Sequence, residues 1–171
     1  MTRREKTALI LGCSHAAGAE IWADPNLHFE QSLVDSDKHE YGLQKSFAAK
    51  IAQHLGYQSI QNRAISGGSN DAMFRVFTET STITIGLIIA CWTSYSRTEI
   101  HDEEWIPINA GTNFFAVDRY NQFRDTWISN FSDVAGRINK IKNITALNAL
   151  AQKENILVIN IDSFMPVTDF E

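Results

Sequence analysis

Three short polar segments of this chain have the residue types that hydrolytic chemistry uses, and each follows an apolar run. They are residues 12–14, 62–68 and 92–97, which come after apolar runs at 8–11, 57–61 and 83–91. Ligands of open α/β sheets bind at the carboxyl ends of the strands. Ser14 is therefore a candidate nucleophile, and a serine that only caps a strand-to-helix turn is the alternative interpretation.

Together the three segments offer the groups that acyl transfer requires, which are a hydroxyl nucleophile and several donors for a developing oxyanion. Ser14 supplies the hydroxyl, and the glycine-bearing turn supplies the backbone N–H of Gly67. Thr93 and Ser94 add side-chain donors after the third run. We expect Arg97 to face the same crevice or to pair with Glu99 or an acidic loop residue. An exposed guanidinium is the alternative for Arg97.

The order of these segments resembles the SGNH (GDSL-type) hydrolases, which are flavodoxin-like α/β esterases and lipases. Gly12-Cys13-Ser14 resembles their first motif, Gly-Asp-Ser, with cysteine in place of aspartate. The segment 62–67 resembles their Asn-x-Gly-x-Ser-Gly turn, and 91–95 falls where Gly-x-Asn-Asp is expected. The resemblance implies that Ser14 is the nucleophile and that the N–H groups of Ser14 and Gly67 form the oxyanion hole. Thr93 or Ser94 would take the place of the family's oxyanion asparagine.

Two features depart from the family pattern. Residues 68–71 match Gly-x-Asn-Asp as a string, but they follow the second apolar run, so we interpret them as a helix cap with Ser69 or Asn70 as the capping residue. The Asp-x-x-His motif that supplies the base does not occur, since no histidine follows His101. We therefore expect either the N-terminal part of a longer hydrolase or a form that has lost its base. On either account Ser14 has no histidine partner and the chain is nearly inactive.

Periodicity predicts the elements that must position these residues. Apolar runs predict strands at 8–11, 57–61, 83–91 and 156–161. The first and last are expected to be buried and the third to be a central strand of the sheet. Apolar stripes predict helices: Leu43, Phe47, Ile51 and Leu55, ended by Gly56; Met73, Phe74 and Phe77; Tyr120, Phe123, Trp127 and Phe131; and Val134, Ile138, Ile141 and Ile144. Ser132-Asp133 predicts a break between the last two, and 99–112 is expected to be irregular. The fold class predicted is a three-layer α/β/α domain over residues 1–171. Its parallel sheet has four to five strands, with the first between the second and third.

Composition restricts the function classes. A net charge of −5 argues against a nucleic-acid partner, and no apolar stretch has the length of a membrane span. Cys13 and Cys91 form no disulfide framework or zinc spacing, which predicts free thiols in a cytoplasmic protein. The two are expected to lie close together because they end adjacent strands. No cofactor or metal is predicted. Asp35, Asp37 and His39 could hold a metal, but a solvated loop is the preferred interpretation.

The function predicted is hydrolysis of a small ester, such as an acetylated sugar, through an acyl-enzyme on Ser14. A non-catalytic module on the same fold, binding a carbohydrate or having only a structural role, is the second hypothesis. Nucleotide binding ranks below both, because the chain has neither a Gly-x-Gly-x-x-Gly pattern nor a phosphate-binding Gly-Lys-Ser/Thr.

Overall fold

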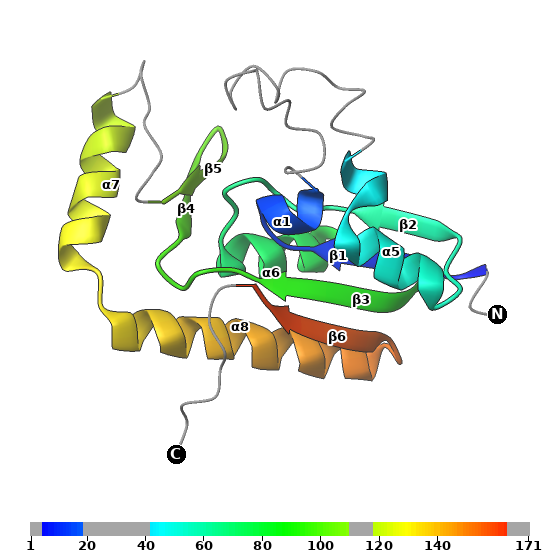
Figure 1. Ribbon diagram of the computed structural model, residues 1–171. Helices are drawn as coiled ribbons and strands as arrows, with labels where there is room; N and C mark the ends of the chain where they lie inside the picture. Colours follow the sequence, from blue (N-terminus) through cyan, green and yellow to red (C-terminus); the bar gives the residue numbers. More distant parts are fainter. Residues whose placement is uncertain (1–4, 19–41, 110–117, 164–171) are drawn as a thin grey trace.

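The computed structural model describes residues 5–18, 42–109 and 118–163. At its centre lies a parallel sheet of four strands in the order β2-β1-β3-β6 (Figure 1). The strands are β1 (Thr7–Leu11), β2 (Ser59–Asn62), β3 (Ile85–Trp92) and β6 (Leu157–Asp162). The mixed α/β class and the place of the first strand between the second and third are as predicted.

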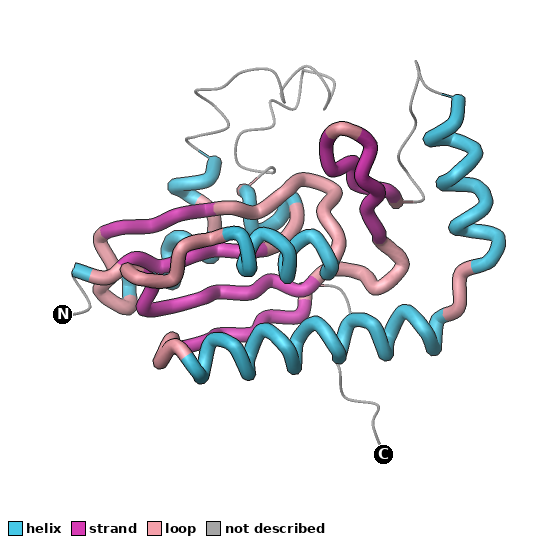
Figure 2. Tube along the Cα trace, turned by 180° about the vertical axis from the view of Figure 1, so that it is seen from behind, coloured by secondary structure: helices cyan, strands magenta, loops and turns pink. Residues whose placement is uncertain are grey.

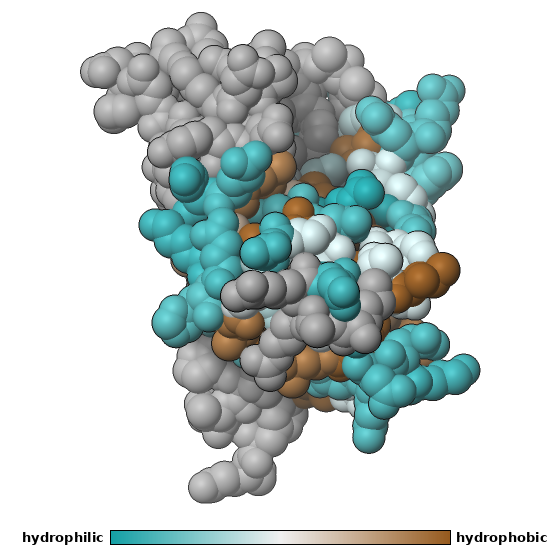
Figure 3. Space-filling view, turned by 90° about the vertical axis from the view of Figure 1, so that its right-hand side faces the viewer, coloured by the Kyte–Doolittle hydropathy of each residue, from teal (hydrophilic) through white to brown (hydrophobic). Residues whose placement is uncertain are grey.

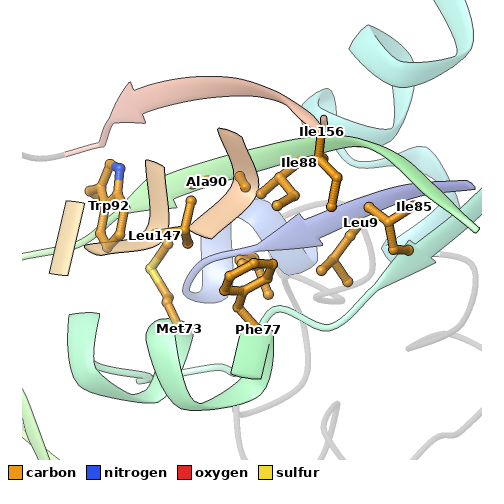
Figure 4. Packing of buried hydrophobic residues seen from close by; sticks show 11 residues of the cluster. Leu9, Met73, Phe77, Ile85, Ile88, Ala90, Trp92, Leu147 and Ile156 are labelled. Atoms are coloured by element: carbon orange, nitrogen blue, oxygen red, sulfur yellow. The ribbon is translucent and has the colours of Figure 1, made fainter. Parts of the chain in front are cut away.

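Helices pack on both faces of the sheet and make three layers. On one face lie α6 (Asn70–Glu79) and α8 (Asp133–Lys153), and on the other lie α1 (Ser14–Ala17) and α5 (Phe47–His54). Side chains alternate along a strand, so β1 sends Leu9 and Leu11 to the α6/α8 face and Ala8 and Ile10 to the other. Figure 4 shows the first of these two cores, in which Met73 of α6 and Leu147 of α8 meet the strands.

The two central strands are apolar because both of their faces are covered. Every residue of β1 and β3 is buried, which explains their nearly continuous apolar sequence. The predicted run at 83–91 begins two residues too early, since the strand starts at Ile85 and Ile83 is 87% exposed. The last strand was predicted to be buried, but β6 lies at an edge of the sheet and its Leu157 is exposed. Its position at the edge leaves one side without a neighbouring described strand.

Helix α5 packs on the sheet through a face that matches the predicted stripe only in part, since Ile51 and Leu55 are partly buried against the core. Its buried residues are the alanines Ala48, Ala49 and Ala52, whereas Phe47 of the predicted stripe is exposed. Small side chains let a helix backbone lie close to a sheet, so the alanine face is the one that packs. The end of the helix is as predicted, because Gly56 adopts a left-handed φ of 90° just past it.

Helix α8 also differs from its predicted stripe. Val134 and Ile138 are exposed, and the buried face carries Lys140 and Asn143 in its first half and Leu147 farther on. The polar pair can be buried because both residues find polar partners on α6 and β6, described below. The predicted break is confirmed: α7 (Asp118–Asn130) ends before α8, and the Ser132 side chain accepts a hydrogen bond from the N–H of Ala135.

The segment predicted to be irregular forms an antiparallel hairpin of β4 (Thr98–Asp102) and β5 (Glu104–Ile108). Glu103 makes the turn between them with a φ of 63°. The hairpin stands beyond the carboxyl ends of the parallel strands, with α7 beside it (Figure 2). Sequence periodicity missed it because one of its strands contains Pro107 and neither strand alternates cleanly in hydrophobicity.

Figure 3 shows the side of the molecule opposite the hairpin, where the parallel strands begin. On this side, hydrophilic side chains are interspersed with small hydrophobic areas. Among the described residues, no helix is both long enough and apolar enough to cross a membrane.

Candidate functional site

The turn after β1 and the turn after β2 lie side by side. Beyond the end of β2 the chain stays bonded to the first turn, since Arg63 donates to the Ile10 carbonyl and Ile65 donates to the Gly12 carbonyl, both at 2.9 Å. The parallel pairing of the two strands therefore continues as far as the residue before Cys13. This brings the predicted oxyanion turn next to the predicted nucleophile turn.

Gly12 marks a close approach between the first turn, α1 and β3. A Cβ added to Gly12 would lie 2.6 Å from the Cβ of Ala16 and 2.9 Å from the Cβ of Cys91. No other residue type fits between these atoms without a shift, so the close packing itself requires glycine here. The neighbouring thiols of Cys13 and Cys91 are free and buried. Burial, with a smaller contribution from nearby Cys13, raises the pKa of Cys91 to about 12.

Ser14 is the first residue of α1 and is half-buried. Cys13 precedes it in an extended conformation, so the serine lies where the strand gives way to the helix, as predicted. The N–H groups at such a helix start have no partner within the helix. Ser14 is thus placed at the carboxyl edge, next to the second and third turns.

Three of the five histidines lie among the described residues. Nδ1 of His15 lies 3.7 Å from the sulfur of Cys13, His54 lies in the last turn of α5, and His101 packs edge-on against Trp105. His28 and His39 lie outside the described residues, together with Asp35 and Asp37 of the considered metal site. Within the described part of the chain, no three His, Cys, Asp or Glu residues cluster as metal ligands would.

The second turn contains Gly67 in a left-handed conformation with a φ of 74°. The N–H of Gly68 closes the turn on the Ile65 carbonyl at 2.8 Å. Asn62 anchors the turn from β2, because its Nδ2 donates to the Ala16 carbonyl at the end of α1 at 2.9 Å. The glycine turn is therefore tied to the helix that Ser14 begins.

The third turn is held in place by Asn70, whose sequence position predicted only a helix cap. Asn70 donates to the Thr93 carbonyl at 3.2 Å and accepts from the Thr93 N–H at 2.9 Å. Thr93 is fully buried, and its Oγ1 has no hydrogen-bond partner among the described residues. Ser94 is half-buried and its hydroxyl lies 2.8 Å from that of Ser96. The expected capping role of Ser69 is confirmed, because its hydroxyl accepts a hydrogen bond from the N–H of Ala72.

Arg97 lies just past this turn and is half-buried, with its Nη1 atom buried. Glu99, one partner considered for it, accepts two hydrogen bonds from Arg75, at 3.0 and 2.9 Å. The role of Arg75 had no signal in the sequence, since 24 residues separate it from Glu99.

The structure also contains a hollow of about 610 Å³ between β2 and α6, lined by Gln61, Arg63, Arg75 and Ser81 among others. None of the predicted site residues lines it. Two residues of the second turn, Arg63 and Ile65, also line it, so the hollow borders that turn.

The predicted residues therefore come from three turns at one edge of the sheet, and their supports, Asn62 and Asn70, come from β2 and α6. Comparisons with protein-family models, with curated proteins and with solved structures found no match.

Proposed function

We propose that the protein is an ester hydrolase of the SGNH type, with Ser14 as its nucleophile. The observation that carries the proposal is the hydrogen bond from Ile65 to the Gly12 carbonyl, which brings the Gly67 turn alongside the Ser14 turn. Oxyanion donors must converge on the atom that the nucleophile attacks. The place of β1 between β2 and β3 in a parallel sheet also supports the proposal, because it brings the ends of these three strands together.

In the proposed reaction the Ser14 hydroxyl attacks the carbonyl carbon of a small ester, and the alcohol leaves with a proton. The N–H groups of Ser14 and Gly67 stabilise the oxyanion, and the side chains of the Thr93–Ser94 turn lie at its border. Water then hydrolyses the acyl-enzyme and regenerates the hydroxyl. Arg97 is proposed to border the substrate crevice. The residue that takes the Ser14 proton is not assigned.

The test is turnover of p-nitrophenyl acetate by the product of the full gene and by its Ser14→Ala variant. We expect the substitution to lower kcat/KM by about 10³-fold or more with an unchanged melting temperature. Gly67→Ala tests the donor turn, because it strains the positive φ there. Equal turnover by Ser14→Ala and the unsubstituted protein would reject the proposal.

A carbohydrate-binding module without catalysis is the second candidate. It is favoured by the contact of His101 with Trp105, which engages the ring of this histidine on the hairpin. Sugar binding by a protein that hydrolyses no ester would support it.

A further inference from the structure

Trp105 is an exposed aromatic side chain on the hairpin beside the proposed site. It is 44% exposed, although the residues around it hold it in place. The guanidinium carbon of Arg75 lies 4.5 Å from the centre of its ring, and His101 packs against it edge-on at 5.0 Å. Arg75 in turn is fixed by its two hydrogen bonds to Glu99, whose side chain is only 7% exposed. The indole is therefore preorganised and still open to a ligand.

The hairpin reaches the proposed site through the same face that carries Trp105. A Cβ on Gly67 would lie 4.0 Å from the Cβ of Pro107 and 3.5 Å from the amide nitrogen of Asn109. Pro107 and Trp105 are two residues apart on β5, so their side chains share a face of the hairpin. Two residues of strand span about 6.8 Å. Trp105 thus lies about 7 Å along β5 from Pro107, the residue that approaches the Gly67 turn.

We propose that Trp105 is a stacking platform for the alcohol part of the substrate, and that this part is a sugar ring. The inference rests on the proposed ester hydrolysis at Ser14. A sugar presents a face of C–H groups to an indole, while its hydroxyls need polar neighbours. His101 flanks the indole and Asn109 lies beside Gly67, so both kinds of surface occur on this side of the hairpin. The substrate class is an acylated sugar, with the acyl group at Ser14 and the ring on Trp105.

Binding to the Ser14→Ala variant tests the platform without requiring catalysis. The probes are an acetylated methyl glucoside and ethyl acetate, which has the ester but no ring, and the readout is the indole N–H signals in nitrogen-15 NMR. Trp105→Phe identifies the Trp105 signal among those of the four tryptophans. We expect the glucoside to shift this signal and ethyl acetate to leave it unchanged.

Substitutions then separate stacking from general effects. Trp105→Ala is expected to weaken glucoside binding by about threefold to tenfold, and Trp105→Phe by less. Phe123→Ala is the matched control, because Phe123 is a similarly exposed aromatic residue on α7, and it should leave binding unchanged. Melting temperatures confirm that each variant is folded.

Two results would overturn the platform: equal glucoside affinity in Trp105→Ala, or an equal shift of the Trp105 signal by ethyl acetate. If hydrolysis depends on Ser14 but Trp105→Ala binds normally, the platform is wrong and the proposed function stands. If Trp105 binds the glucoside but Ser14→Ala hydrolyses esters normally, the proposed hydrolysis at Ser14 is wrong and Trp105 is a sugar-binding residue only.

Discussion

The Cys91 thiol lies at the carboxyl end of a fully buried strand, next to the turn that presents Ser14. Gly12 packs on its Cβ, and the thiol is buried with a pKa raised to about 12, mainly by loss of solvation. A thiol in an unfolded chain has a pKa of about 8.5. Between these two values the folded protein holds a proton that the unfolded chain releases.

Cys91 should therefore make the stability of the protein fall in alkaline solution. Its contribution is complete below about pH 8.5 and is lost as the pH rises toward 12, amounting to about 2 kcal/mol by pH 10. The check is urea unfolding at pH 7 and pH 10 for the unsubstituted protein and for Cys91→Ala. The variant should lose about 2 kcal/mol less between the two pH values, and equal losses would contradict the assignment.

The Asn70 side chain makes hydrogen bonds to both the N–H and the C=O of Thr93. Asn70→Ala should lower the free energy of unfolding by about 1–3 kcal/mol, because it leaves a buried N–H and a buried C=O without partners. Asn70→Asp can still accept from the Thr93 N–H but cannot donate to the Thr93 carbonyl, so it is expected to be destabilising as well. Thermal and urea unfolding provide the measurement, and an unchanged midpoint in both variants would rule out the clamp.

At the scale of elements, the β4–β5 hairpin is held by side chains from two helices. Arg75 of α6 binds Glu99 of β4, and Arg119 and Tyr120 of α7 contact Asp102 at the end of β4. The first pair is mostly buried, whereas Arg119 is largely exposed. A hydrogen bond to Glu99 is the main cause that raises the pKa of Arg75, so the guanidinium stays charged at neutral pH. The pair with α6 should therefore contribute more to the stability of the hairpin than the pair with α7.

We predict that Arg75→Met lowers the free energy of unfolding by about 2–4 kcal/mol, since it leaves the Glu99 carboxylate unpaired in a mostly buried place. Arg119→Met removes an exposed pair that solvent already screens and should have little effect. Urea unfolding measures both, and limited proteolysis within 98–108 reports on the hairpin itself. Equal effects of the two substitutions would show that the α6 attachment is not special.

At the scale of the whole molecule, polar contacts join the last helix and strand to the rest of the fold. Lys140 of α8 is 5% exposed and binds Asp162 of β6 at 2.8 Å. Asn139 and Asn143 of α8 donate to Asp71 of α6, at 3.0 and 2.9 Å. The first half of α8 is thus attached to the fold by these polar contacts, whereas the second half is attached by the apolar packing of Leu147.

Lys140→Met should destabilise the protein by about 3–5 kcal/mol, because the mostly buried Asp162 carboxylate loses its ion pair with Lys140. The double variant Lys140→Met, Asp162→Leu removes both charges and should recover much of this loss. Calorimetric melting of the two variants decides the matter. A double variant no more stable than Lys140→Met alone would mean that the pair is not the cause.

The sequence by itself determined the elements whose signals are local. The central strands were predictable because burial on both faces demands a continuous apolar run, and β1 and β3 are such runs. Ser69 and Ser132 predicted the starts of two helices, and Gly56 predicted the end of another, because capping depends on residues within one turn. The grouping of the Ser14, Gly67 and Thr93 turns followed from strand order, since parallel strands end at one edge.

Only the tertiary structure decided which faces are buried and which distant residues meet. An apolar stripe shows which face of a helix could be buried, but the neighbouring elements determine which face is buried. Helix α5 therefore has alanines as its fully buried residues, and α8 buries Lys140. The hairpin depends on Arg75 and Glu99, and the third turn on Asn70, pairs separated by more than twenty residues. Such contacts have no local signature, because chain folding and not sequence spacing sets the distance between their atoms.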